Sequence, residues 1–215
     1  MHQMLHRAGL TIGRDRLFEL LGQNNLLIRQ KRSGARTTYS KHGFRYYRNL
    51  VKDRVVTSSN QVYVSDITYL RTLEGFCYLF LITDLYSRKI VGYHLADSLC
   101  VQEALKALRM ALREQDPEKE LIHHSDRGIQ YCAYDYTNRL KDAGVQISMT
   151  EKDHVYENAT AERVNGILKT EFMLGELLKS KMIAKKMVHQ AIRIYNKERL
   201  HMSLCYQTPD QVHAA

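Results

Sequence analysis

The chain has 215 residues, of which 44% are hydrophobic and 26% are charged, a composition typical of a globular protein with one sizeable core. No apolar run approaches the roughly 18 residues of a membrane span, and the N-terminus has no signal-peptide pattern, so we expect a soluble, cytoplasmic protein. The net charge of +9 lies wholly in residues 1–54, which contain 12 Lys/Arg and three Asp/Glu.

The rest of the chain is neutral in sum but unevenly charged. Residues 55–162 carry a net −5 and residues 163–215 a net +5. Basic ends attract polyanions and an acidic centre attracts divalent cations, so this pattern favours a metal-dependent protein that acts on nucleic acid. Lys and Arg that merely solvate helix faces would give the same charges. The four cysteines are too far apart to indicate a zinc knuckle or a disulfide framework.

The N-terminal quarter predicts one short helix and a basic linker. Over residues 11–21 the leucines recur at helical spacing, and Gly22 marks the end of the helix. Residues 28–54 contain many Lys and Arg with no clear hydrophobic period, which is typical of an extended linker.

Strand and helix patterns fill the remainder. Residues 61–70, 76–83 and 89–95 are rich in β-branched and aromatic residues and predict three consecutive antiparallel strands. Further along, the pattern predicts helices over 101–113, 134–143, 156–172 and 181–198 and short strands over 121–124 and 145–148. This order indicates an α/β fold, a mixed five-stranded sheet with helices on its faces.

Three acidic residues fall where such a fold forms a site. Asp66 lies in the first strand, Asp126 directly follows the fourth, and Glu162 lies on a long helix. In open sheets, sites gather at strand ends. Three carboxylates from separate elements would supply the oxygen ligands that Mg²⁺ prefers.

The helix around Glu162 offers a geometric check. At about 100° per residue, Asn158, Asn165 and Lys169 fall on the same side as Glu162 and form a polar ridge beside an apolar stripe. Lys169, two turns away, is placed to meet a phosphate. A solvated helix face would look the same, so the ridge alone does not decide between the two interpretations.

Four ordered blocks carry a resemblance to a known family. These are Asp66-Ile-Thr-Tyr69, the block from His124 to Tyr131, the block from Glu157 to Glu171, and the block from Tyr195 to Pro209, with 35 residues between Asp126 and Glu162. Together they resemble the bacterial insertion-sequence transposases whose catalytic core is similar to retroviral integrase, specifically the second-frame product of the IS-three family. The resemblance covers about residues 11–209.

The resemblance implies a ribonuclease H-like fold and a division into three parts. These are a basic DNA-binding segment with linker (1–54), an integrase-like catalytic core (55–175) and a helical C-terminal extension (176–215). It also implies that Asp66, Asp126 and Glu162 bind two Mg²⁺ (or Mn²⁺) ions, which support DNA cleavage and strand transfer without a covalent protein intermediate.

Further implications concern partners. The resemblance implies double-stranded DNA as the partner, both the terminal inverted repeats of an element and target DNA, bound by a homo-oligomer at the bacterial nucleoid. The side chains expected at DNA are Arg14, Arg16, Arg127, Arg163, Lys169 and Arg199. A helix that only packs on the core, or ordinary surface solvation, is the competing interpretation for each of them.

Several alternatives stay open. His123 and His124 could act on a metal or a proton, although a role in orienting the loop is favoured. Asp84 could support the site or simply open a turn. Glu157 is a weaker rival of Glu162. For the whole chain, the alternatives are a truncated, catalytically impaired copy that represses transposition by binding DNA, and a structure-specific nuclease on the same fold.

Overall fold

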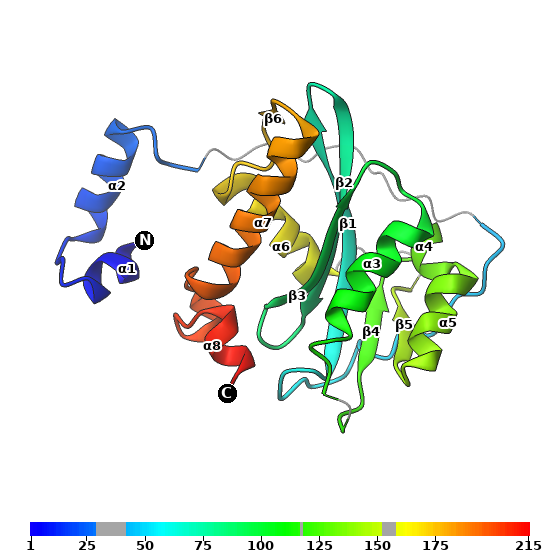
Figure 1. Ribbon diagram of the computed structural model, residues 1–215. Helices are drawn as coiled ribbons and strands as arrows, with labels where there is room; N and C mark the ends of the chain where they lie inside the picture. The colour runs from blue at the N-terminus through cyan, green and yellow to red at the C-terminus, as the bar shows by residue number, and fades with distance from the viewer. Residues whose placement is uncertain (29–41, 117, 152–157) are drawn as a thin grey trace.

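The computed structural model describes residues 1–28, 42–116, 118–151 and 158–215 (Figure 1). Its centre is a mixed sheet with the strand order β3-β2-β1-β4-β5. The bounds are β1 (Val62–Thr72), β2 (Gly75–Asp84), β3 (Ile90–Ala96), β4 (Ile122–Ser125) and β5 (Gln146–Met149). The first three strands pair antiparallel, whereas β4 and β5 run parallel to β1, so the predicted α/β fold and its five strands are confirmed.

A sixth strand was not predicted. The two-residue strand β6 (Leu177–Leu178) pairs in parallel with the end of β1, at Arg71 and Thr72. The prediction of five strands is therefore one short, because two residues are too few to show a strand period. This strand follows the helix that carries Glu162 and joins that helix to β1.

The helices form a layer on each face of the sheet (Figure 1). One layer contains α3 (Val101–Ala111), α4 (Ile129–Cys132) and α5 (Tyr134–Asp142), and the other contains α6 (Ala159–Glu171) and α7 (Lys181–Lys197). Alternate residues of β2 pack against opposite helix layers. Phe80 packs on the α3 side of the core, and Leu79 packs on the side of α6 and α7. Because α7 buries its apolar face here, it shares one core with the sheet.

Gly92 lets α3 lie close to β3. A Cβ atom at this position would lie 2.4 Å from the Ala107 carbonyl oxygen and 2.8 Å from the Ala111 Cβ. We expect Gly92→Ala to lower the free energy of unfolding by about 2 kcal/mol, because the helix must move outward. Gly166→Ala is the matched control, since Gly166 lies on α6 with open space around it and should gain stability from the better helix former. Denaturant unfolding measures both, and equal changes in the two variants would contradict the packing argument.

The N-terminal part contains α1 (His2–Arg7) and α2 (Arg14–Gln23). The helix predicted over 11–21 thus begins and ends later than expected, and α1 was not predicted. The predicted linker is described only from residue 42, since 29–41 lie outside the described residues. Its described end is not extended away from the core, because Phe44 and Tyr47 pack against the α3 side of the core.

The chain ends with a 3₁₀ turn (Met202–Leu204) and α8 (Pro209–His213). Thr208 caps α8 with a reciprocal capping box to Gln211, and Pro209 takes the first helical position. Throughout the portion of the chain that the structure describes, no helix is both long enough and apolar enough to cross a membrane.

Candidate active site

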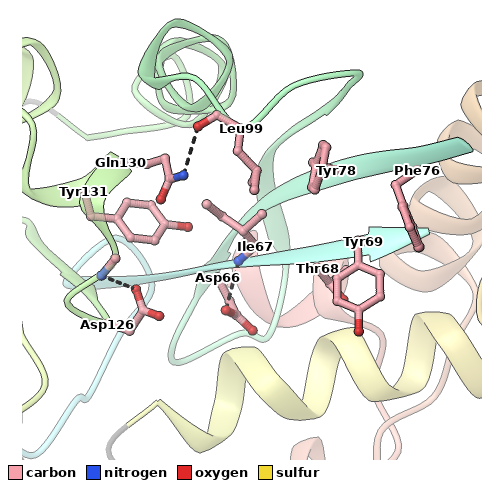
Figure 2. Close-up of a pocket in the computed structure, with 11 residues that line it drawn as sticks. Asp66, Ile67, Thr68, Tyr69, Phe76, Tyr78, Leu99, Asp126, Gln130 and Tyr131 are labelled. Carbon is pink, nitrogen blue, oxygen red and sulfur yellow. Dashed lines mark hydrogen bonds between the residues drawn. The ribbon is translucent and has the colours of Figure 1, made fainter. Parts of the chain in front are cut away.

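Strand pairing brings Asp66 and Asp126 together. The parallel register of β1 and β4 pairs Ser65 with Ser125, so the residues that follow them in the chain, Asp66 and Asp126, lie beside each other where the pairing of the two strands ends. Both aspartates line one pocket of 390 Å³. Figure 2 shows the two carboxylates on the same side of β1. The two residues that sequence analysis selected from separate strands thus lie at one pocket, Asp66 within β1 and Asp126 just past the end of β4.

The pocket beside the two aspartates has mostly apolar walls (Figure 2). Its other lining residues come from β1, β2, α4 and the segments preceding α3 and α4, and are Ile67, Thr68, Tyr69, Phe76, Tyr78, Leu99, Gly128, Gln130 and Tyr131. Phe76 is 52% exposed and packs edge-on against Tyr69, with the ring centroids 5.6 Å apart. The aromatic groups thus form a surface that adjoins the acidic pair.

Hydrogen bonds fix both aspartates. Asn165 of α6 donates from Nδ2 to Asp66 Oδ2 at 2.6 Å, and the Ile67 backbone N–H donates to Asp66 Oδ1 at 2.9 Å. The Gly128 N–H donates to Asp126 Oδ1 at 2.9 Å. An ionised carboxylate accepts about four hydrogen bonds, so the two that Asp66 receives from these described residues do not exhaust its oxygens.

Burial is the main cause that raises the pKa of Asp66 to about 7, and the charges of Asp126 and Glu162 also contribute to this rise. The hydrogen bonds from Asn165 and Ile67 oppose the shift. The other two acidic side chains therefore both oppose the charged form of Asp66. Such mutual repulsion is what a bound cation relieves, and the all-oxygen donor set suits a hard divalent ion.

Glu162 lies outside the pocket that the two aspartates line. It is exposed in the first turn of α6 and does not line the pocket. Within the described part of the chain, no three His, Cys, Asp or Glu side chains stand close enough together to hold a metal ion. The structure thus brings Asp66 and Asp126 together and places Glu162 nearby, on the helix that contacts Asp66 through Asn165.

Lys169 lies on the same helix, two turns from Glu162. Its ammonium group stands 4.9 Å from the centroid of the Tyr69 ring, a cation–π contact on the wall of the pocket. Burial lowers the pKa of Lys169, and the negative charge of Asp66 opposes this. The ridge predicted from helical spacing therefore places a cation beside the aspartates.

Both strand histidines make buried hydrogen bonds. His123 Nε2 lies 2.6 Å from Ser65 Oγ and 3.0 Å from the Tyr136 hydroxyl oxygen, and burial lowers its pKa to about 3. His124 Nδ1 lies 2.8 Å from Ser148 Oγ. These buried hydrogen bonds hold the end of β4, from which the loop with Asp126 continues; that the histidines orient this loop stays a prediction.

Arg127 is held by the protein. Its Nε donates to the Thr150 carbonyl at 2.7 Å, and its guanidinium group lies 5.0 Å from the centroid of the Tyr46 ring. His42 Nε2 hydrogen-bonds to the Arg127 carbonyl oxygen at 2.9 Å. The described end of the basic segment therefore holds the loop that follows Asp126.

The other arginines expected at DNA lie elsewhere. Arg163 and Arg199 line a second cavity, on the far side of α6. Arg14 stacks on Phe18, and Arg16 pairs with Glu19 on the exposed surface of α2. These four arginines do not line the pocket of Asp66 and Asp126.

Asp84 has the role expected of a turn residue. Its Oδ1 accepts hydrogen bonds from the Ser87 N–H at 2.7 Å and from Ser87 Oγ at 2.8 Å, and its Oδ2 accepts one from the Asn60 N–H at 2.8 Å. These bonds shape the turn between β2 and β3. The rival carboxylate Glu157 lies outside the described residues.

Sequence reasoning missed several parts of this region. Asn165 was placed on the correct helix face but not recognised as the partner of Asp66, and the aromatic wall of Tyr69, Phe76 and Tyr78 was not predicted. Alternation along β1 and β2 could have indicated the wall, because the two strands join in a hairpin and these residues share a face. Arg88, which lies in the turn after β2, had no sequence signal.

Comparisons with known proteins agree with this geometry. Two models of the integrase core domain match the chain, one over residues 56–154 and the other over residues 143–209. The insertion element IS600 uncharacterized 31 kDa protein of Shigella sonnei is 40% identical over 202 residues, which cover 93% of this chain and 74% of that protein. The transposase InsF for insertion sequence IS3A of Escherichia coli K12 is 35% identical, over 89% and 67% of the two chains.

Solved structures show the same fold at low sequence identity. The catalytic core domain of HTLV-2 integrase, in complex with magnesium, matches 77% of this chain and 99% of that one with a TM-score of 0.58. A chain of the simian T-cell lymphotropic virus intasome matches all of this chain and 74% of its own length with a TM-score of 0.64. Both are 16% identical, so they establish the ribonuclease H-like fold alone.

Proposed function

The chain belongs to the insertion-sequence transposases with an integrase core domain, and we propose that it cleaves and joins DNA at Asp66, Asp126 and Glu162. It is a transposase of the polynucleotidyl-transferase class. The observation that carries the site assignment is that Asp66, within β1, and Asp126, just after the end of the paired strand β4, line one pocket, with Glu162 acting on the pKa of Asp66.

Divalent ions would be held by these carboxylates. Two Mg²⁺ or Mn²⁺ ions supply Lewis-acid stabilisation of a phosphoryl group and lower the pKa of an attacking hydroxyl or water. Asp66 and Asp126 present oxygens to the same pocket, so they would share an ion between them. Glu162 would add its carboxylate from the first turn of α6.

Neighbouring side chains would position DNA at this site. Lys169 provides a cation beside Asp66 for a non-bridging phosphate oxygen, and its contact with Tyr69 restrains the flexible side chain. Gly128 bonds one oxygen of Asp126 and so fixes the carboxylate orientation. Apolar walls exclude water from one side of the pocket, which strengthens the electrostatic contacts within it.

We further propose the physiological setting of this reaction. The DNA substrates are the terminal inverted repeats of an insertion sequence and a target duplex, and the protein acts as a homo-oligomer at the nucleoid in the cytoplasm. The transposase names of the relatives and the intasome title of one structural neighbour support this setting.

The test of the proposal is metal-dependent strand cleavage. Purified protein incubated with labelled duplex that ends in the repeats of the element should nick or join strands with Mg²⁺ or Mn²⁺ and lose this activity in EDTA, because the carboxylates cannot activate the phosphate alone. Restoring Mg²⁺ after chelation should restore the products, as resolved on denaturing gels. Equal cleavage with and without a divalent ion would contradict the proposal.

A further inference from the structure

A second cavity, of 630 Å³, lies on the far side of α6 from Asp66. Asn165 faces Asp66, whereas Thr160, Arg163 and Ile167 line the cavity and fall on another face of the helix. The remaining walls come from the turn after β2, the end of α7, residues 199–206 and the start of α1. One helix thus separates the acidic pocket from a second concave site.

Three guanidinium groups surround this cavity. They belong to Arg88, Arg163 and Arg199, which come from three separate parts of the chain. Arg199 is neutralised, because it forms a two-armed ion pair with Glu171 at 2.6 and 2.7 Å. Among the described residues no carboxylate pairs with Arg88 or Arg163, so the site keeps an excess of positive charge.

His201 adds a buried nitrogen without a partner. The residue is only 6% exposed, lines the cavity and packs edge-on against Tyr195 with the ring centroids 5.1 Å apart. Within the described residues its Nε2 atom has no hydrogen-bond partner. An unsatisfied buried polar group costs about 1–3 kcal/mol, so a ligand that bonds this nitrogen would recover that energy.

The charges around this cavity indicate which kind of ligand it suits. Burial, followed by the charges of Arg199, Arg88 and Arg163, lowers the pKa of His201 to about 4 against the opposing effect of Glu171. The imidazole is therefore neutral at physiological pH and can donate one N–H without adding charge. Neutral donor and flanking guanidinium groups together match the oxygens of a phosphate.

We propose that this cavity binds a backbone phosphate of DNA, held by Arg88, Arg163 and the Nε2–H of His201. The first turn of α6, with Ala159 and Thr160, forms part of the wall and adds the positive end of the helix dipole. This inference rests on the proposed function, because DNA engaged at Asp66 must pass close to α6. It also gives a role to the C-terminal block around Tyr195 and His201.

Dimensions favour a DNA segment over a free ion. A cavity of 630 Å³ is far larger than one phosphate group and has room for a sugar and its flanking phosphates. Arg163 is next to Glu162 in the sequence. A DNA strand that crosses the start of α6 therefore spans only the width of one helix, about 10 Å, between the pocket of Asp66 and this cavity.

The experiment measures DNA binding in EDTA, so that metal-dependent chemistry does not contribute. Fluorescence anisotropy with a labelled duplex at several salt concentrations should show that Arg163→Gln weakens binding about 3- to 10-fold and reduces the salt slope by about 0.9, the value for one lost phosphate contact. Arg139→Gln is the matched control, because Arg139 is exposed on α5 in the opposite layer. It should change neither quantity.

A second measurement reports on His201 directly. NMR of the His201 ring should show chemical-shift changes when duplex DNA is added to the wild-type protein, and much smaller changes in Arg163→Gln. Because Arg163 is exposed, this variant keeps the fold, which a thermal melt checks. Arg88→Gln is a second variant for the same measurements. It differs from Arg163→Gln because it also removes the hydrogen bonds that Arg88 donates to the Leu85 carbonyl and the Thr160 hydroxyl.

Each outcome decides the proposal. Wild-type affinity and salt slope in Arg163→Gln, or an unchanged His201 signal with DNA, would overturn it. Titration with inorganic phosphate is the comparison arm, and a His201 response to phosphate but not to duplex would assign the cavity to a free anion and refute the DNA assignment. Cleavage with Mg²⁺ is scored separately, so a failure of the proposed catalysis is distinguished from a failure of this phosphate site.

Discussion

Replacing Asp126 with Asn should reduce DNA cleavage and strand joining by about 1,000-fold, since the loss of a metal-binding charge removes several kcal/mol of transition-state stabilisation. The Asn side chain keeps an oxygen that can accept the Gly128 N–H, so the loop after β4 retains its shape. DNA binding in EDTA should stay within about twofold, because the variant removes no phosphate donor. Gel assays of cleavage and anisotropy of binding measure the two effects.

Asp53→Asn is the control for this variant. Asp53 is exposed, lies outside the pocket and loses the same charge on substitution. It should keep wild-type cleavage. Activity within tenfold of the wild type in Asp126→Asn would remove Asp126 from the proposed centre, whatever the behaviour of Asp53→Asn.

Replacing Asp66 with Asn should abolish activity and at the same time stabilise the metal-free protein. Burial and the neighbouring charges raise the pKa of Asp66 to about 7, so above that pH the folded state contains an unfavourable carboxylate. Asn removes this penalty, and the unpartnered Oδ1 of Asn165 can accept a hydrogen bond from the new amide after a simple flip. We expect Asp66→Asn to raise the free energy of unfolding by about 2 kcal/mol at pH 8. This is less than the full pKa shift of Asp66 implies, because the pocket is open to solvent.

The pH dependence of this gain has a definite sign. In the unfolded chain the pKa of Asp66 is the ordinary one for an aspartate, 3.8, whereas in the folded protein it is about 7. The folded wild type therefore binds the proton more tightly, and its stability falls as pH rises through this interval. The advantage of Asp66→Asn should be large at pH 8 and small at pH 5, as measured by denaturant unfolding in EDTA.

Mg²⁺ should reverse the order of the two proteins. A ligand that binds only the folded state stabilises it, so Mg²⁺ should raise the melting temperature of the wild type and leave Asp66→Asn nearly unchanged. An equal gain at both pH values, or an equal response to Mg²⁺, would show that Asp66 is not an ion-binding carboxylate under repulsion. Asp53→Asn again serves as the control.

The sheet and the acidic pair were predictable because they depend on strong local patterns. Long strands rich in β-branched residues identified β1 to β3, and the position of Asp126 after a buried strand placed it beside Asp66. The strand β6 is too short for any period. The helix α8 could have been predicted, since Thr208 followed by Pro209 is a helix start.

Other features depend on contacts that one sequence does not reveal. The segment around Phe44 and Tyr47 was interpreted as a linker because its basic residues obscure two aromatic anchors, which pack on the core. Arg88 joins Arg163 and Arg199 from 75 and 111 residues away, and no periodicity relates such positions. The placement of Glu162 depends on the tilt of α6, which propensity does not determine.

The short strand β6 also fixes one end of α6 against the sheet. It pairs with the far end of β1, and Gly175 donates its N–H to the Lys169 carbonyl, so the last turn of α6 is fastened to the strand that carries Asp66. At the other end of the helix, Asn158 Nδ2 donates to the carbonyl oxygen of Ser65, the residue before Asp66, at 3.0 Å. The helix is therefore attached to β1 at both ends, and Glu162 lies about 14 Å along its axis from the last residue. Because both attachments are to β1, Glu162 and Lys169 are held in register with the strand that carries Asp66.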